Sequence, residues 1–255
     1  MPTRKISRYG WRPDHPDRRD RKFSIEQRVN LPAQVDLSKL PAMPPIYDQG
    51  ELGSCTANAI AAAVDFERGI QKETFITPSR LFIYYNERAI EGATAEDSGA
   101  ELRDGIKVVA NSGVCPESEW PYEISHFAEQ PPAHCFADAL HFKALQYSSV
   151  TQDPYFVRHC LAILGKPVAF GMSVYDAFES DDVAATGVVP MPAANEAPVG
   201  GHAVLLVGYD DASQRFKVRN SWGADWGSSG YFTIPYRFVL DPDLASDFWT
   251  ITLES

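Results

Sequence analysis

One cysteine of the chain stands where a glycine-containing loop gives way to a run of small apolar residues. Residues 49–54 read Gln-Gly-Glu-Leu-Gly-Ser, Cys55 follows, and residues 56–64 read Thr-Ala-Asn-Ala-Ile-Ala-Ala-Ala-Val. The pattern predicts a helix that begins at the cysteine. There the positive end of the helix dipole stabilises a thiolate, the nucleophilic form of the side chain. Gln49 lies six residues upstream and offers a side-chain amide that can donate to a developing oxyanion.

A histidine and an asparagine in the last third of the chain supply the other groups of a nucleophilic site. His202 opens an apolar run at residues 203–209, and a second expected strand at 216–219 leads directly to Asn220. Taken alone, a cysteine beside alanines is usually a small buried hydrophobe. With a base, and an amide to orient that base, Cys55 is expected to attack a peptide carbonyl and form an acyl-thioester, while His202 protonates the leaving amine.

Three motifs of the chain resemble those of the papain-like cysteine peptidases. They are Gln-Gly-x-x-Gly-Ser-Cys at 49–55, Gly-His-Ala-Val-x-x-Val-Gly-Tyr at 201–209 and Asn-Ser-Trp-Gly-x-x-Trp-Gly-x-x-Gly-Tyr at 220–231. They occur in the family's order and at similar separations. The resemblance extends from about Leu31 to the C-terminus and includes two segments within residues 111–122, which look like the family's Gly-Gly and Tyr-Pro-Tyr region.

The resemblance implies an α+β, papain-like two-lobed fold, with a helical lobe, an antiparallel β-barrel-like lobe and the active-site cleft between them. We expect a basic N-terminal pre-segment at residues 1–30, a helical lobe carrying the nucleophile at 31–145 and a β-rich lobe carrying the histidine and asparagine at 146–255. The function that follows is hydrolysis of peptide bonds by a cysteine endopeptidase.

Family roles carry over to five residues of the motifs. Cys55, His202 and Asn220 are the expected nucleophile, base and orienting amide, and the thiolate is expected to form an ion pair with the histidine. The Gln49 side-chain amide and the backbone N–H of the cysteine are expected to hold the oxyanion. Trp222 is expected to shield the histidine–asparagine hydrogen bond from water.

Alignment with the family also assigns substrate-binding residues. The pair that hydrogen-bonds the substrate backbone aligns with Ser98 and Gly99, and the wall of the S2 pocket aligns with mostly small residues. The substrate-binding set is Ser98, Gly99, Ala100, Glu101, Gly171, Gly200, Gly201, Ala203 and Trp222. Such a pocket favours a bulky apolar P2 residue, and Glu101 could admit a basic one.

Apolar patterning predicts the elements that position these groups. Residues 55–70, 79–86 and 101–111 are expected to form helices, with Ser79 as an N-cap. After about Lys143 the pattern changes to strands. These are expected at 168–174, 203–209, 216–220, 230–234 and 247–253.

The four cysteines and the motif spacings bear on disulfides, metals and cofactors. The family's usual partner cysteine, three residues before the nucleophile, is Leu52 here, so that bridge cannot form. Cys115 and Cys135 could pair, but spacing alone does not decide it. Cys160 lies in a helical pattern and is expected to be packed. There is no C-x-x-C pair, no H-E-x-x-H and no Gly-rich phosphate loop after a strand, so no metal and no cofactor are expected.

Charge is divided unevenly along the chain. Residues 1–30 hold nine Lys or Arg and four Asp or Glu, whereas the remainder holds 14 and 30. The acidic body would repel phosphates, so no nucleic-acid partner is expected. The basic arm is expected either to fold back onto the body or to remain a solvated tail. In the first case Tyr9 and Trp11 would plug or border the cleft, and the arm would be autoinhibitory, as in a zymogen.

The expected partner is a peptide or protein substrate, and the expected state is a monomer. No apolar run is long enough to span a bilayer, so no membrane partner is expected. The first residues lack an apolar core, so no signal peptide is visible, and the protein is cytoplasmic or exported by a route that the sequence does not reveal. Two alternatives remain: a catalytically silent homologue that binds peptides or regulates a partner, and an exopeptidase or transpeptidase with the same site.

Overall fold

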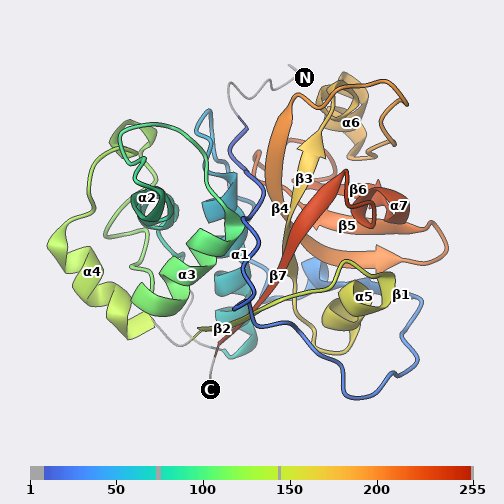
Figure 1. Cartoon of the computed structure of the whole chain (residues 1–255), viewed down its shortest axis with the longest axis horizontal. Coiled ribbons are helices and arrows are strands. Elements are labelled where there is room, and N and C mark those ends of the chain that lie inside the picture. Colours follow the sequence, from blue (N-terminus) through green and yellow to red (C-terminus); the bar gives the residue numbers. More distant parts are fainter. Residues whose placement is uncertain (1–8, 73–75, 143–144, 254–255) are drawn as a thin grey trace.

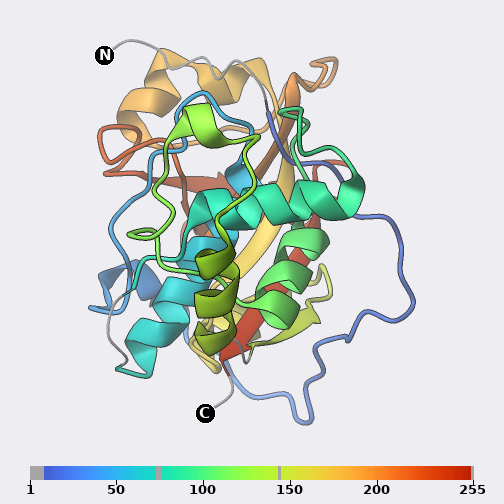
Figure 2. The ribbon, with the colours of Figure 1, turned by 90° about the vertical axis from the view of Figure 1, so that its left-hand side faces the viewer.

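The computed structural model describes residues 9–72, 76–142 and 145–253. A helical lobe and a sheet lobe lie side by side, with helix α1 (Cys55–Ile70) between them (Figure 1). Viewed from the helical side, the helices stand in front of the sheet (Figure 2). The α+β, two-lobed architecture expected from the sequence is therefore confirmed.

The helices of the described residues fall into two groups. The helical lobe contains α1, α2 (Arg80–Glu91), α3 (Leu102–Ser112) and α4 (Ala133–Ala139). The sheet lobe carries α5 (Pro154–Ala162), α6 (Asp181–Thr186) and α7 (Tyr236–Val239). Short 3-10 helices lie at Leu37–Lys39, Ile124–His126, Leu140–Phe142 and Asp176–Glu179.

Seven strands of the described residues form one antiparallel sheet. Its order is β2-β7-β3-β4-β5-β6, and β1 pairs with β4 off this path. The strands are β1 (Gln34–Asp36), β2 (Leu145–Ser149), β3 (Val168–Val174), β4 (Gly200–Asp210), β5 (Arg215–Arg219), β6 (Tyr231–Pro235) and β7 (Ala245–Leu253). The pairing of β1 means that the residues expected to form the helical lobe also contribute one strand to the sheet.

The predicted helices and strands lie within a few residues of the observed ones. Helix α1 has the predicted bounds, and its alanines combine high helix propensity with side chains small enough for close contact with both lobes. Ser79 caps α2 as predicted, because its hydroxyl accepts a hydrogen bond from the backbone N–H of Phe82 at 3.1 Å. Gly92 ends that helix in the left-handed conformation that favours glycine, with φ of 73°.

Strand pairing brings the predicted base and its orienting amide together. In the β4–β5 ladder, Leu205 pairs with Arg219. His202 lies three residues before the first of these, and Asn220 follows the second directly. Because the strands are antiparallel, both residues lie at the same end of the ladder. That end faces the first turn of α1, where Cys55 lies.

Residues 9–30, which we call the N-terminal segment, fold back along the body of the protein. The segment, dark blue in Figure 1, passes between the two lobes and then along the sheet side of the molecule. Its course past the sheet is fixed by backbone hydrogen bonds, in which Ser149 N–H donates to Arg21 O at 2.8 Å and Phe23 N–H donates to Ser149 O at 2.8 Å. Of the two expectations for residues 1–30, the folded-back arm therefore describes residues 9–30, and residues 1–8 lie outside the described part of the chain.

All four cysteines are buried and unpaired. Cys160 packs on α5, as predicted. Leu52 is also buried. Cys115 and Cys135 lie close together without a disulfide, which is taken up below.

Candidate active site

The predicted nucleophile is the first residue of α1, and it is completely buried. The Cys55 sulfur accepts a hydrogen bond from the backbone N–H of Ala203 at 3.3 Å, so it lies beside the residue that follows the predicted base. Burial raises the pKa of the Cys55 thiol to about 12, although backbone N–H groups, including that of Gly10, oppose the rise. In the structure as it stands, the thiol is the favoured form.

The predicted base is oriented by the predicted asparagine. His202 Nε2 donates to Asn220 Oδ1 at 2.8 Å, and Asn220 Oδ1 also accepts from the backbone N–H of Ser221 at 2.8 Å. Because Nε2 carries the proton in this bond, Nδ1 is the nitrogen that can receive the proton of Cys55, and it has no hydrogen-bond partner. Trp222 covers the imidazole, with ring centroids 5.0 Å apart and planes at 30°, as expected of a shield.

The expected thiolate–imidazolium ion pair is not the form that this structure favours. His202 is fully buried, and burial lowers its pKa to about 4 while it raises that of Cys55. In a buried site, the hydration free energy that a thiolate and an imidazolium lose exceeds their mutual Coulomb attraction. Both groups therefore remain neutral. The structure brings the two predicted residues together, but their protonation depends on what covers them.

Gln49 is held in place by a residue that sequence reasoning missed. Its side-chain oxygen accepts from the Ser221 hydroxyl at 2.6 Å, and its backbone N–H donates to the carbonyl of the same serine at 2.8 Å. The Gln49 Nε2 group donates one hydrogen bond to Leu52 O at 2.9 Å. The position of Ser221 inside the Asn-Ser-Trp motif was the signal available in the sequence.

The residue after the nucleophile, Thr56, joins α1 to α2. Its hydroxyl donates to the carboxyl of Glu87 on α2, at 2.6 Å from Oε2, and both residues are buried. Burial raises the pKa of Glu87 well above its usual range. A buried polar bond thus holds the first turn of α1 against α2.

The N-terminal segment lies across residues predicted to bind substrate. Ala100 N–H donates to Gly10 O at 2.7 Å, and Ala100 O accepts from Arg12 N–H at 3.1 Å. On the other side, Trp11 N–H donates to Gly201 O at 3.0 Å. The segment is therefore bonded through its backbone to both walls of the cleft, as an extended peptide would be.

Ser98 and Gly99, the pair predicted to hydrogen-bond the substrate backbone, lie beside this bridge. The Ser98 hydroxyl donates to Gly99 O at 3.1 Å, and Gly99 N–H donates to the Tyr84 hydroxyl at 3.2 Å, so these groups are bonded within the helical lobe. The bridge to the segment is made one residue later, by Ala100. A substrate-binding role for the pair stays a prediction.

Small residues of the sheet lobe receive the aromatic side chains of the segment. A Cβ atom on Gly171 would lie 1.8 Å from the indole of Trp11, and one on Gly201 would lie 2.6 Å from the same ring. A Cβ atom on Gly200 would lie 2.5 Å from the ring of Tyr9. Of the residues predicted to line S2, Gly171 therefore borders the pocket that holds Trp11, whereas Gly200 borders the neighbouring space.

Glu101, the charged residue of the predicted substrate-binding set, faces the segment. Its carboxylate accepts from the backbone N–H of His15 at 3.0 Å and contacts the ring nitrogen Nδ1 of the same histidine at 2.5 Å. It is the N-cap residue of α3. An acidic group at this edge of the cleft can thus pair with a cationic side chain.

Comparisons with known proteins agree with this geometry. A family model described as "Papain family cysteine protease" matches residues 31–239. An uncharacterized peptidase C1-like protein of Acanthamoeba polyphaga mimivirus is 41% identical, and the alignment covers 98% of this chain and 89% of that protein. A KDEL-tailed cysteine endopeptidase of Arabidopsis thaliana is 30% identical, with 87% of this chain and 58% of that protein covered.

A solved structure is similar over its whole length. Xylellain, a cysteine protease from Xylella fastidiosa, has a TM-score of 0.91 and 45% sequence identity, and the alignment covers 100% of this chain and 99% of that one. The family match, the relatives and the Cys-His-Asn geometry lead to one assignment. The chain belongs to the papain family of cysteine proteases.

Proposed function

We propose that the protein is an endopeptidase whose N-terminal segment keeps it inactive until the segment is displaced. The observation that carries the proposal is the complete burial of both Cys55 and His202 beneath residues 9–12. A substrate carbonyl cannot reach the sulfur while these residues remain in the cleft. Displacement would readmit water, which favours the charged forms of both groups.

The segment is bound in a way that avoids its own cleavage. Gly10 lies at the nucleophile, but its N–H group faces the sulfur and its carbonyl oxygen accepts from Ala100. The Gln49 side-chain amide donates to Leu52 rather than to the segment. The carbonyl of Gly10 is therefore turned away from the oxyanion position, and a scissile geometry is absent at this residue.

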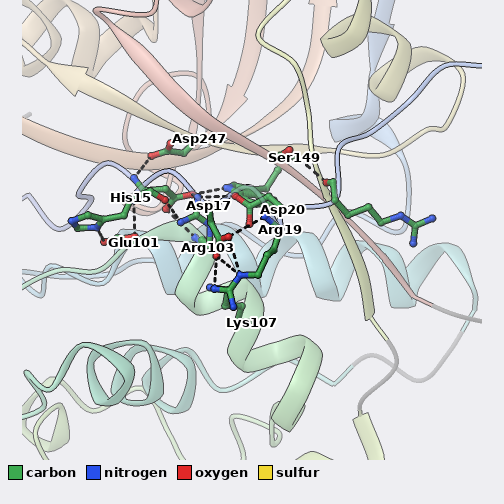
Figure 3. A network of polar contacts seen from close by, with 12 residues as sticks. His15, Asp17, Arg19, Asp20, Glu101, Arg103, Lys107, Ser149 and Asp247 are labelled. Atoms are coloured by element: carbon green, nitrogen blue, oxygen red, sulfur yellow. Dashed lines mark hydrogen bonds and ion pairs between the residues drawn. The ribbon is translucent and has the colours of Figure 1, made fainter.

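A cluster of charged residues anchors the segment beside the cleft (Figure 3). Arg103 of α3 forms an ion pair with Asp20 at 2.8 Å, and its backbone N–H donates to Asp14 at 3.1 Å. Asp14 in turn donates its N–H to Asp247 at 2.8 Å and accepts from the indole N–H of Trp249 at 2.8 Å. Although the segment is basic overall, its acidic side chains Asp14 and Asp20 make these contacts with the body. Attraction between a basic segment and an acidic body therefore does not by itself explain the docking.

The pocket that holds Trp11 supports a preference for bulky apolar P2 residues. The indole occupies space that exists because Gly171 has no side chain, and the pocket accepts an aromatic ring in the docked segment. The pairing of Glu101 with His15 supports tolerance of a basic side chain nearby. Peptides with glycine or aspartate at P2 should be poor substrates.

The course of the segment supports an endopeptidase rather than an exopeptidase. Tyr9 lies on one side of the nucleophile, where its hydroxyl donates to Glu179 at 2.5 Å, and the chain continues on the other side through Asp14. A cleft that accommodates a continuous chain on both sides of Cys55 can accommodate the middle of a substrate.

The experiment that tests the proposal compares three proteins on a fluorogenic dipeptide with a hydrophobic P2 residue and arginine at P1. They are the full chain, a form that begins at Leu31, and that shortened form with Cys55→Ala. We expect hydrolysis by the shortened form, at least about tenfold less by the full chain, and none by the variant, since removal of a nucleophile abolishes the covalent route.

Two results would change the proposal. Equal activity of the full and shortened forms would remove the inhibitory role of the segment. If neither form hydrolyses the dipeptide and a thiol-reactive epoxide does not label Cys55, a peptide-binding homologue without catalytic activity would be favoured.

A further inference from the structure

Two cysteines of the helical lobe meet a carboxylate and a histidine away from the cleft. The Sγ atoms of Cys115 and Cys135 and a carboxylate oxygen of Glu119 all lie within 4.8 Å of one another. His134 Nε2 lies 3.5 Å from the sulfur of Cys135. Three side chains that commonly bind transition metals thus meet at one place, and a fourth, His134, adjoins one of them, Cys135.

The backbone fixes three of these residues from separate parts of the lobe. Cys115 follows α3, and its carbonyl accepts from the backbone N–H of Ser79 at 2.8 Å, directly before α2. A turn brings Glu119 next to it, with its N–H bonded to Pro116 O at 3.0 Å. Cys135 lies in the first turn of α4, where its N–H donates to Pro132 O at 3.0 Å.

The donor set matches zinc. Two thiolates, an imidazole and a carboxylate give the four ligands of a closed tetrahedral site, which is the arrangement of structural zinc. With Zn–S of about 2.3 Å and Zn–N of about 2.0 Å, tetrahedral geometry separates sulfur and nitrogen by about 3.5 Å. That is the distance between His134 Nε2 and the sulfur of Cys135.

Both cysteines of the cluster are buried, and one carboxylate oxygen of Glu119 is buried without a hydrogen-bond partner. Both thiols are completely buried, and burial raises their pKa values, more so for Cys115 because Cys135 lies beside it. Burial and the neighbouring Asp138 raise the pKa of Glu119, and its buried Oε2 has no hydrogen-bond partner. A divalent cation would reverse each of these effects, since it stabilises thiolates and carboxylates directly.

We propose that Cys115, Glu119, His134 and Cys135 form a structural Zn²⁺ site that ties the turn after α3 to the start of α4. The sequence analysis predicts no metal site, because no C-x-x-C pair is present and the two cysteines are 20 residues apart. The site is independent of the nucleophile, so it stands or falls separately from the endopeptidase proposal.

Zinc content tests the proposal. The full chain with Cys55→Ala, which removes the catalytic thiol, is treated with a phosphine reductant, loaded with Zn²⁺, dialysed against metal-free buffer and analysed by mass spectrometry for metals. We expect about one Zn²⁺ per chain, and its loss when Cys115→Ser or Cys135→Ser is added. Cys160→Ser, a buried cysteine outside the cluster, is the matched control and should retain the ion.

Cobalt provides a readout that does not depend on the cysteine variants folding. The same protein loaded with Co²⁺ should show the absorption of tetrahedral cobalt with sulfur charge-transfer bands. Glu119→Gln should keep the sulfur bands and raise the Kd for Zn²⁺ at least about tenfold, since even outer-shell partners of metal ligands contribute about 10- to 100-fold. Reduced, folded protein that retains no Zn²⁺ and gives no cobalt spectrum would overturn the proposal, and a Cys115–Cys135 disulfide in protein isolated without reductant would then explain the proximity.

Discussion

The indole of Trp11 lies directly against the backbone of Gly171, so close that a Cβ atom on the glycine would fall 1.8 Å from the ring. The pocket for the segment's largest side chain near the nucleophile is therefore made by the absence of a side chain on β3. Trp11 is almost fully buried there. This contact links the docking of the N-terminal segment to the proposed substrate pocket, because both depend on the same space.

Gly171→Ala should therefore have opposite effects in the two forms of the protein. In the full chain the new methyl group excludes Trp11, and the rate of peptide hydrolysis should rise towards that of the form beginning at Leu31. In the shortened form, KM for a substrate with an aromatic P2 residue should rise by about tenfold, as expected when a pocket loses the volume of about one methylene. Steady-state kinetics on both forms measures this.

Gly200→Ala is the matched control for that experiment. Its methyl group would meet the ring of Tyr9 rather than Trp11. It should release the segment while leaving KM for aromatic P2 substrates unchanged in the shortened form. If both alanine variants raise that KM equally, Trp11 does not occupy the pocket that binds the P2 side chain of a substrate.

Gly10→Ala should release the segment without any change to the body of the enzyme. A Cβ atom at this position would lie 1.7 Å from the carbonyl oxygen of Gly53, a backbone atom that cannot move aside cheaply. We expect the full chain with this substitution to hydrolyse the fluorogenic dipeptide at a rate within about threefold of the shortened form, because docking is lost rather than weakened. Arg18→Ala, at an exposed position of the same segment, should leave the full chain inhibited.

If the full chain with Gly10→Ala does not hydrolyse the dipeptide while the shortened form does, the docked arrangement of the segment would be contradicted. Limited proteolysis gives a second measurement on the same samples. The variant's segment should be cut faster than the original, since a released chain is accessible along its length.

Docking of the segment should weaken as the pH rises from about 4 to 7. Burial beside Asp247 raises the pKa of Asp14 to about 7, whereas a released aspartate has a pKa of about 3.9. Between these values the docked state binds the proton and the released state does not, so each rise in pH favours release.

The ratio of the initial rates of the full and shortened forms isolates this effect, because the pH dependence of catalysis itself cancels. We expect the ratio to increase between about pH 4 and 7 and to level off above that range. Asp14→Asn, which removes the titrating carboxyl, should flatten the profile. A ratio that decreases with rising pH would show that another group controls docking.

Local motifs predicted the reacting groups, but the environment of these groups depends on distant parts of the chain. Cys55 and His202 were identified from their flanking residues, whereas their neutral forms result from burial by residues 9–12. The backbone bridge from Ala100 to Trp11 depends on the docked segment and not on the local sequence around Ala100. Strand β1, which pairs with β4, has only three residues, too few to show the alternation of apolar and polar residues that predicts a strand.

Ser221 should act on catalysis through Gln49 rather than by contact with substrate. Its hydroxyl donates to the Gln49 side-chain oxygen at 2.6 Å and so fixes the direction of the amide N–H groups. In the shortened form, Gln49→Ala should lower kcat by about 10²- to 10³-fold, the usual effect of losing one oxyanion donor. Ser221→Ala should lower kcat by about tenfold with KM unchanged, since a misplaced donor still retains part of its effect.

The double variant separates positioning from a merely structural role. If the serine acts through the glutamine, Ser221→Ala should change kcat less than about twofold once Gln49 is already alanine, because the two substitutions remove the same contribution. Thermal unfolding of the four proteins checks that folding is intact. Fully additive losses of kcat would mean that Ser221 contributes independently of Gln49, and the assignment of the serine as a positioning residue would then be wrong.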